Sequence, residues 1–338
     1  MRAAILGCAG PTLGDGERDF LKDADPFGFI LFKRNCETPD QIRTLIAGLR
    51  QAVGREAPIL IDQEGGRVQR IGPPTWRAAP PAETFGALYA RDPERGLEAT
   101  RLNARMLAEE LRLLDITVDC LPVLDLRFAD THAAIGNRAF SGDVETVIAL
   151  AMAQVEGLRA AGLLPVVKHM PGHGRARVDS HFELPVVDAD GETLMATDFA
   201  TFQALADLPM GMTGHLMFPA FDRDRVSTLS PAVIGEVIRG HIGFDGLLMS
   251  DDLSMQALGG SIGERAAGSI SAGCDIALHC NGEAAEMEQV IANVPDLADW
   301  ALVRAEAVVA ESASALADAE PLDMDAAASQ LEALLDDG

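Results

Sequence analysis

The chain has 338 residues, of which 48% are hydrophobic and 23% are charged, with glycine and proline spread throughout. This composition is typical of a globular protein with a large core and excludes a disordered or fibrous chain. A formal net charge of −25 opposes binding to nucleic-acid phosphates and anionic membrane surfaces, so we expect no nucleic-acid partner and no membrane partner.

The amino-terminal segment is predicted to be a short buried strand rather than a targeting signal. Ile5-Leu6-Gly7-Cys8 superficially resembles a lipoprotein cleavage site. However, the apolar run before Cys8 is shorter than the roughly 7–15 residues of a signal-peptide core, and no stretch approaches the ~20 apolar residues of a membrane span. The five cysteines lack a CxxC spacing, which indicates free thiols in a reducing compartment. We therefore expect a cytoplasmic protein.

Short apolar runs recur along the chain, and most are continuous rather than alternating, as expected for parallel strands covered on both faces. The predicted strands are Ala3–Cys8, Gly28–Phe32, Pro58–Asp62, Ile116–Asp119, Leu163–Lys168, Pro209–Thr213, Gly246–Ser250 and Cys274–Leu278.

Helix-favouring segments lie between these strands. Their starts or spans are marked by Thr38-Pro39-Asp40, Glu98 to Leu114, Ser141-Gly142-Asp143, Asp190 to Leu205 and Ser230-Pro231. Alternation of strands and helices predicts a parallel sheet built from βαβ units. Eight such repeats favour a single-domain (β/α)8 TIM-type barrel over an open doubly wound sheet, and no GxGxxG follows the first strand.

The carboxyl-terminal segment, Pro295 to Gly338, is rich in alanine and acidic residues at helical spacing. We expect it to form helices packed on the outside of the barrel, within one catalytic domain that spans residues 1–338.

Polar residues follow several of the apolar strands. Such groups are costly to bury without partners, and the active sites of barrels lie where strands end and loops begin. Their placement therefore indicates a functional mouth. Five of the seven histidines fall at or just after predicted strand ends: His169, His173, His181, His215 and His279.

Asp251 directly follows the segment Leu247-Leu248-Met249-Ser250. A carboxylate at the mouth of a barrel can serve as a nucleophile, a metal ligand or a helix N-cap. Its neighbour Asp252 is expected to cap a helix that begins near Leu253.

The loop 171–181 contains two glycines and flanking polar residues, which are typical of a flexible segment over a site. Asp179 and His181 are two residues apart and would share a face in extended backbone. A carboxylate can fix the tautomer of an imidazole and raise its basicity. The alternative is a surface turn with an incidental histidine. We expect the loop 170–183 to be mobile without ligand.

Two further patterns have weaker chemical meaning. His169 and His173 are four residues apart, but Pro171 between them makes the helix of a metal-binding HxxxH motif unfavourable, so we expect no metal. The segment 65–70 is glycine-rich but lacks the Lys-Ser/Thr of a phosphate loop. It indicates a glycine turn, with Asp62 and Arg70 as candidates to hold ligand hydroxyls.

Five segments with polar or glycine residues at strand ends occur in this order: Ile61-Asp62-Gln63-Glu64-Gly65-Gly66-Arg67-Val68-Gln69-Arg70, Asn137-Arg138-Ala139-Phe140, Lys168-His169-Met170-Pro171-Gly172-His173-Gly174, Asp179-Ser180-His181 and Ser250-Asp251-Asp252-Leu253-Ser254-Met255. In these segments, and over about residues 20 to 290, the chain resembles the cytoplasmic β-N-acetylglucosaminidases of glycoside hydrolase family 3. Met170 is a departure, since the family usually has Phe there.

The resemblance implies a retaining mechanism. Asp251 would be the nucleophile that forms a covalent glycosyl-enzyme. His181 would be the acid/base, and Asp179 would be its dyad partner. The implied residues that bind the N-acetylglucosamine ring are Asp62, Arg70, Arg138, Lys168 and His169.

The implied substrate is a muropeptide fragment, N-acetylglucosaminyl-β-1,4-anhydro-N-acetylmuramic acid with or without peptide, in cell-wall recycling. No cofactor is implied, and we expect a monomer rather than a dimer. The alternatives are a glycoside phosphorylase, a β-glucosidase, a sugar-binding barrel without activity and, as the least favoured, a metal-dependent amidohydrolase.

Overall fold

The computed structural model describes residues 1–180 and 182–336. Its main sheet has eight strands that pair in parallel, one at each of the eight predicted positions. The strands are β1 (Arg2–Gly7), β2 (Pro26–Leu31), β3 (Ile59–Ile61), β6 (Val118–Asp119), β7 (Leu164–Met170), β8 (Met210–Thr213), β9 (Leu247–Met249) and β10 (Ala277–His279).

The sheet closes on itself. Its order is β10-β1-β2-β3-β6-β7-β8-β9, so the first and last strands in this order must meet to complete a ring. They do so through a parallel bridge between Met249 and Ile276 and through a 3.0 Å hydrogen bond from Ser250 N to the Ile276 carbonyl. The (β/α)8 barrel predicted from the sequence is confirmed.

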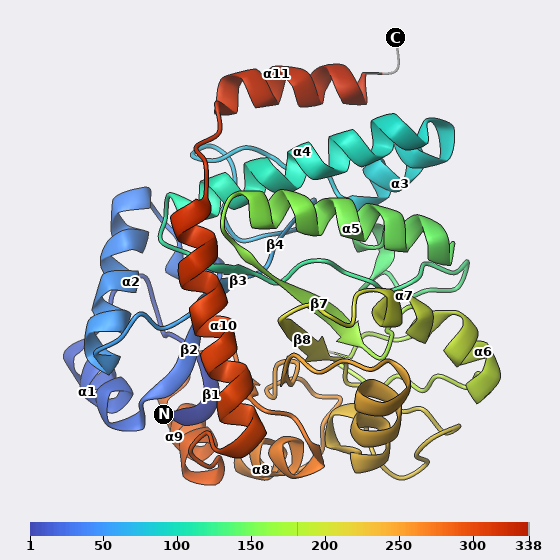
Figure 1. Ribbon diagram of the computed structural model, residues 1–338. Coiled ribbons are helices and arrows are strands. Elements are labelled where there is room, and N and C mark those ends of the chain that lie inside the picture. The colour runs from blue at the N-terminus through green and yellow to red at the C-terminus, as the bar shows by residue number, and fades with distance from the viewer. Residues whose placement is uncertain (181, 337–338) are drawn as a thin grey trace.

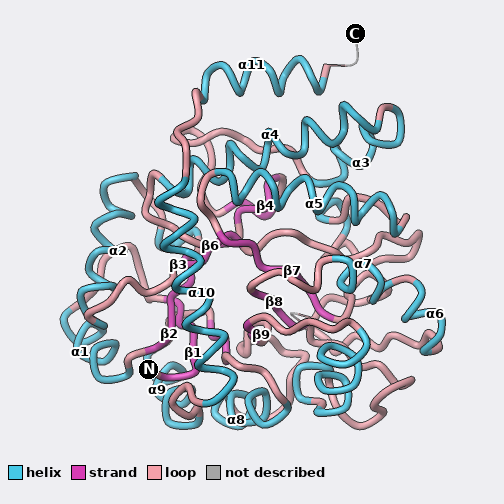
Figure 2. The backbone as a smooth tube through the Cα atoms, in the orientation of Figure 1, coloured by secondary structure: helices cyan, strands magenta, loops and turns pink. Residues whose placement is uncertain are grey.

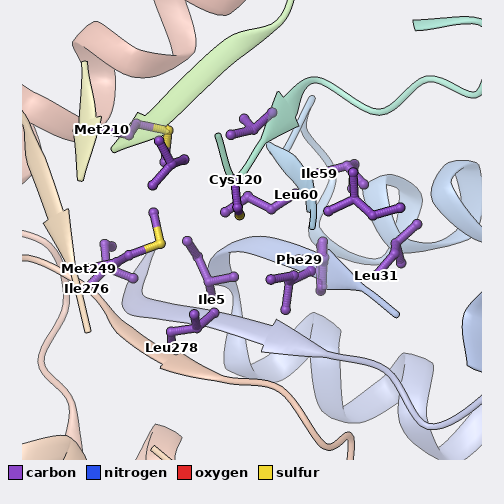
Figure 3. Packing of buried hydrophobic residues seen from close by; sticks show 14 of the residues in the cluster. Ile5, Phe29, Leu31, Ile59, Leu60, Cys120, Met210, Met249, Ile276 and Leu278 are labelled. Atoms are coloured by element: carbon purple, nitrogen blue, oxygen red, sulfur yellow. The ribbon is translucent and has the colours of Figure 1, made fainter. Parts of the chain in front are cut away.

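Apolar side chains fill the barrel. The strands β2, β3 and β7 are buried at every position, because helices cover their outer faces. Figure 3 shows Ile5, Phe29, Met210 and Met249 from different strands in one cluster. A filled interior leaves the ends of the strands as the place for a site.

Helices surround the strands (Figures 1 and 2). The α-helices are α1 (Asp15–Ala24), α2 (Pro39–Val53), α3 (Ala82–Arg91), α4 (Pro93–Arg112), α5 (Val144–Ala160), α6 (Gly191–Ala196), α7 (Asp198–Ala204), α8 (Ile262–Ala272), α9 (Ala284–Asn293), α10 (Asp299–Asp318) and α11 (Met324–Leu335). The 3-10 helices are η1 (Lys33–Asn35), η2 (Gly136–Arg138) and η3 (Ser227–Leu229), and η4 (Val233–His241) is a π-helix.

Most predicted helix starts are confirmed by their caps. The side chains of Thr38 and Asp143 accept hydrogen bonds from the first turns of α2 and α5. The segment predicted as one helix from Asp190 to Leu205 is instead two helices, because the backbone leaves the helical region at Thr197 (φ −125°, ψ −84°). The small antiparallel hairpin of β4 (Gln63–Gly65) and β5 (Val68–Gln69) was not predicted.

The last two helices lie on different parts of the barrel. In Figure 1, α10 runs across the front of the molecule and α11 lies beside α4. Arg304 of α10 donates to the Asp245 carbonyl before β9 at 2.8 Å and to Asp275 before β10 at 3.1 Å. The helix α10 therefore covers the amino ends of these strands and leaves their carboxyl ends open. No helix among the described residues is long and apolar enough to span a bilayer.

Candidate active site

A cavity of about 290 Å³ opens at the carboxyl ends of the barrel strands. Seven of the eight site residues predicted from the sequence line it, although they come from distant parts of the chain. These seven are Asp62, Arg70, Arg138, Lys168, His169, Asp179 and Asp251. The eighth, His181, lies outside the described residues.

A cluster of buried and half-buried charged side chains forms one part of the cavity wall. Lys168 Nζ lies 2.7 Å from Asp62 Oδ1 and 2.7 Å from Glu64 Oε1. Arg70 Nη2 donates to Asp62 Oδ2 at 2.7 Å, and Arg138 donates to both oxygens of Glu64 at 2.7 and 2.8 Å. Three cations face two carboxylates, so the cluster carries a local positive charge in a strongly acidic protein.

The cluster holds its members in their charged forms. Burial by itself raises the pKa of the Glu64 carboxyl, but the adjacent Arg138 and Lys168 outweigh burial and lower it to about 2. Asp62 follows the same pattern, and its pKa is held below its usual range by Lys168 and Arg70. Burial opposes the charged form of Lys168, yet the two carboxylates raise its pKa. The resulting array of fixed donors and acceptors suits recognition of a polyhydroxylated ligand.

The β4–β5 hairpin explains how this cluster assembles from a short segment. Gly65 and Gly66 adopt positive φ angles of 92° and 56°, which glycine tolerates best, and the turn brings Arg70 back toward Asp62. The Gln63 side chain fixes the return strand, because its Oε1 accepts from Arg70 N at 2.9 Å. The predicted glycine turn and the predicted ligand-binding pair are thus parts of one structure.

His169 is held by Asp125, which follows β6. Burial raises the pKa of Asp125, but the neighbouring histidines lower it further than burial raises it, so the carboxylate is ionised and can only accept. His169 Nδ1 therefore donates to Asp125 Oδ2 at 2.7 Å. Arg138 Nη2, which lacks a lone pair, lies 3.3 Å from His169 Nε2. These two contacts place the imidazole proton on Nδ1 and leave Nε2 as an acceptor.

Asp251 and Asp252 have different environments. Asp251 lines the cavity, its backbone N–H donates to Thr213 Oγ1 at 3.3 Å, and its Oδ1 accepts from Asp252 N at 2.8 Å. The Asp252 Oδ1 accepts from the backbone N–H groups of Ser254 and Cys280, both at 3.1 Å. Asp252 also lines the cavity, but its carboxylate is engaged by the backbone of its own loop and of the segment after β10.

The predicted N-cap role of Asp252 is wrong. No helix begins near Leu253; the segment is a series of turns, and α8 begins at Ile262 after its own cap, Ser261. The Asp252 carboxylate instead accepts from Cys280 N, just after the end of β10.

The backbone that follows Asp179 forms a turn. The Asp179 carbonyl accepts from Phe182 N at 3.0 Å and from Glu183 N at 2.9 Å, so the turn considered as the alternative is found here and not extended backbone. The Asp179 side chain nevertheless lines the cavity, so the expected carboxylate is in place at its edge.

Four of the five histidines predicted at strand ends lie within the described residues, and their outcomes differ. His169 and His173 line the cavity. His215 bonds to Thr228 Oγ1 at 2.8 Å and to the Asp252 carbonyl at 3.0 Å, and His279 bonds to Glu286 at 2.9 Å, so both support the structure around the site. Among the described residues, no group of three or more His, Cys, Asp or Glu could hold a metal ion.

Several residues of the site were not predicted from the sequence. Glu64 was part of a quoted motif but was given no role, and Asp125 and Ser180 were not singled out. The signal for Asp125 was available, since it directly follows the apolar residues 121–124, a short distance after β6. Such a carboxylate, buried to 1% exposure, needs a partner.

The chain is similar to known proteins over most of its length. The model described as "Glycosyl hydrolase family 3 N terminal domain" matches residues 12–313. A protein named beta-hexosaminidase from Xylella fastidiosa (strain 9a5c) is 40% identical over 283 residues, which cover 82% of this chain and 83% of that protein.

Solved structures match over nearly the whole chain. The structure of NagZ from Neisseria gonorrhoeae in complex with N-trifluoroacetyl-D-glucosamine aligns with a TM-score of 0.87 at 30% identity, covering 99% of this chain and 98% of that one. A family 3 beta-N-acetylglucosaminidase from Paenibacillus sp. str. FPU-7 aligns with a TM-score of 0.85 at 29% identity, covering 98% of this chain and 66% of that one.

Proposed function

Because the chain belongs to glycosyl hydrolase family 3 and is a glycoside hydrolase, we propose that it is a retaining β-N-acetylglucosaminidase. The observation that carries this proposal is that Asp251 and Asp179 open onto the same cavity as the charged cluster of Asp62, Arg70 and Lys168. The similarity to proteins named beta-hexosaminidase and beta-N-acetylglucosaminidase supports this choice of sugar.

In the proposed mechanism Asp251 attacks the anomeric carbon while the glycosidic oxygen takes a proton from His181 and leaves. This step forms a covalent glycosyl-enzyme through the Asp251 carboxylate. His181 then removes a proton from water, which attacks the same carbon and releases the sugar with retained configuration and Asp251 restored. Asp179, as the dyad partner, would orient the His181 ring and stabilise its charged form.

The charged cluster would bind the N-acetylglucosamine ring. Asp62 can accept from sugar hydroxyls, whereas Arg70, Arg138 and Lys168 can donate to sugar oxygens. His169 Nε2, already near Arg138, is an acceptor at the cavity wall. Because these groups hold one another at 2.7–3.3 Å, they are preorganised before the sugar binds.

We further propose that the substrate is a muropeptide fragment with a non-reducing terminal N-acetylglucosamine, in peptidoglycan recycling in the cytoplasm. The arginine and lysine side chains that line the cavity, Arg67, Arg70, Arg138 and Lys168, would offset the acidic surface for an anionic muramyl leaving group. We also propose that residues 1–338 form one catalytic domain in which 295–338 are outer helices.

Trapping of the covalent intermediate tests the proposal. A 5-fluoro-N-acetylglucosaminyl fluoride should give an adduct that peptide mapping places on Asp251. An adduct on another residue would overturn the assigned nucleophile. Products formed with and without inorganic phosphate distinguish hydrolysis from phosphorolysis, since a phosphorylase would release a sugar 1-phosphate. Turnover of 4-nitrophenyl β-glucoside above that of the N-acetylglucosaminide would instead indicate a β-glucosidase.

A further inference from the structure

Ser180 is the point at which the loop after β7 attaches to the barrel. It is only 4% exposed, whereas Phe182 in the same loop is 74% exposed. Its hydroxyl oxygen lies 3.2 Å from His173 Nε2, and its carbonyl accepts from Ala257 N at 3.2 Å. A buried serine whose hydroxyl and carbonyl are both engaged holds the backbone around it in place.

His173 is itself held firmly. It is 3% exposed, its backbone N–H donates to Asp125 Oδ1 at 2.6 Å, and its ring packs edge-on against His169 at 5.7 Å. Burial lowers the pKa of His173 to about 4, so the ring is neutral near neutral pH. The proposed chemistry gives this histidine no role, although it lines the cavity.

The two bonds of Ser180 connect two loops that carry proposed catalytic residues. Asp179 directly precedes Ser180, and Ala257 lies in the run of turns that follows Asp251. Asp125 holds His173 through one oxygen and His169 through the other. A continuous set of buried hydrogen bonds therefore runs from the sugar-binding wall at His169 to the backbone beside Asp179.

We propose that His173 and Ser180 are positioning residues that set the place of Asp179 relative to Asp251. This inference rests on the proposed function, because it assumes that Asp179 is the partner of the acid/base. Neither His173 nor Ser180 transfers a proton to the substrate. Their hydrogen bond orders the loop, so that the carboxylate of Asp179 supports protonation of the leaving group.

Leaving-group dependence separates this role from a merely structural one. Ser180→Ala deletes the hydroxyl and keeps the carbonyl bond to Ala257. Methyl β-N-acetylglucosaminide needs protonation of its leaving oxygen more than 4-nitrophenyl β-N-acetylglucosaminide does. Loss of one hydrogen bond of ordinary strength should lower kcat/KM for the methyl glycoside about 10-fold, with a loss below about 2-fold for the nitrophenyl glycoside. Ser180→Thr, which keeps a hydroxyl, should recover most of the loss.

A double variant tests whether the two residues act as one unit. The double variant Ser180→Ala with His173→Gln should be no less active toward the methyl glycoside than the less active of the two single variants. The reason is that both substitutions remove the same contact. Ser269→Ala is the matched control: its buried hydroxyl donates to the Ala266 carbonyl within α8, and its loss should leave the ratio of the two substrates unchanged.

Equal losses on both substrates, no loss in Ser180→Ala, or independent effects in the double variant would each overturn the positioning role. Failure of the proposed function has a different signature, since the wild-type protein would then turn over neither N-acetylglucosaminide. If His173→Gln does not fold, comparison of Ser180→Ala with Ser180→Thr still decides the question.

Discussion

The Glu64 carboxylate and the Arg138 guanidinium form a two-pronged ion pair, with Arg138 Nε and Nη2 at 2.7 and 2.8 Å from separate carboxylate oxygens. The Glu64 side chain is 4% exposed and that of Arg138 is 14% exposed. Glu64 also contacts Lys168. A single carboxylate thus orients two cations that line the cavity.

Glu64→Gln should weaken substrate binding more than it slows the chemical step. The amide keeps the shape of the side chain but removes the charge that balances Arg138 and Lys168. We expect KM to rise about 10-fold and the free energy of unfolding to fall by roughly 1–3 kcal/mol. Steady-state kinetics with 4-nitrophenyl β-N-acetylglucosaminide and urea unfolding measure the two effects.

Glu109→Gln provides the matched control for this prediction. Glu109 is also buried, with 4% exposure, and pairs with Arg112 at 2.6 Å on the helix α4, away from the cavity. Its loss should lower stability without a change in KM. If Glu64→Gln behaves in the same way, Glu64 has no part in binding.

Asp251→Asn should lower activity and Asp252→Asn should lower stability, although the residues are neighbours. An amide at 251 cannot form the glycosyl-enzyme, so kcat should fall by at least about 1,000-fold with little change in stability. An amide at 252 weakens acceptance from Ser254 N and Cys280 N, so stability should fall by about 1–3 kcal/mol. Steady-state kinetics and thermal unfolding of both variants measure these effects on kcat and on stability.

This pair of variants also tests the identity of the nucleophile. Full activity in a folded Asp251→Asn protein would contradict the proposed mechanism, and a catalytic loss confined to Asp252→Asn would transfer the role to its neighbour. Addition of azide to an Asp251→Ala variant gives a second test, because a small anion in the vacated space should yield a glycosyl azide of inverted configuration.

His181→Ala should reduce the hydrolysis of substrates with poor leaving groups most. An alkyl glycoside requires protonation of its leaving oxygen, whereas 4-nitrophenolate departs with little help. We expect kcat/KM to fall by about 100-fold or more for the methyl glycoside and by much less for the nitrophenyl glycoside. An equal loss on both substrates would contradict an acid/base role for His181.

The fold was predictable because its signals are local. Continuous apolar runs, such as those in Pro58–Asp62 and Leu163–Lys168, indicate that a strand is present. They also indicate that both faces of the strand are covered. The caps of α2 and α5 were predictable for the same reason, since Thr38 and Asp143 bond to backbone within three residues of themselves. Closure of the ring followed from the number of repeats.

The parts of the site that depend on long-range pairing were not predictable. Asp125 bonds to residues 44 and 48 positions later in the chain, and Glu64 bonds to Arg138, 74 positions later. Asp252 has the residue type and the position typical of an N-cap. Its carboxylate instead accepts a hydrogen bond from Cys280 N, which is distant in the sequence. Sequence patterns identify which polar residues lie at the mouth, whereas the three-dimensional register decides which of them meet.

The stability of the protein should fall as the pH is lowered from 7 toward 5, in part because of His173. Burial lowers the pKa of His173 from 6.5 to about 4, so in this pH range the unfolded chain binds a proton that the native protein does not. Stability rises with pH wherever the unfolded state holds more protons. His173 should therefore contribute a loss of roughly 2 kcal/mol between pH 7 and pH 5.

His173→Gln removes the titrating group and should flatten the stability profile between pH 7 and pH 5 by that amount. Ser180→Ala is the control, because it deletes the hydrogen-bond partner of the imidazole but leaves the imidazole itself buried. The contribution of His215, whose pKa burial also lowers, is common to all three proteins and cancels in the comparison. Urea unfolding at several pH values measures the slopes. Parallel profiles for wild type and His173→Gln would show that His173 is protonated alike in the folded and unfolded states, against the lowered pKa that its burial implies.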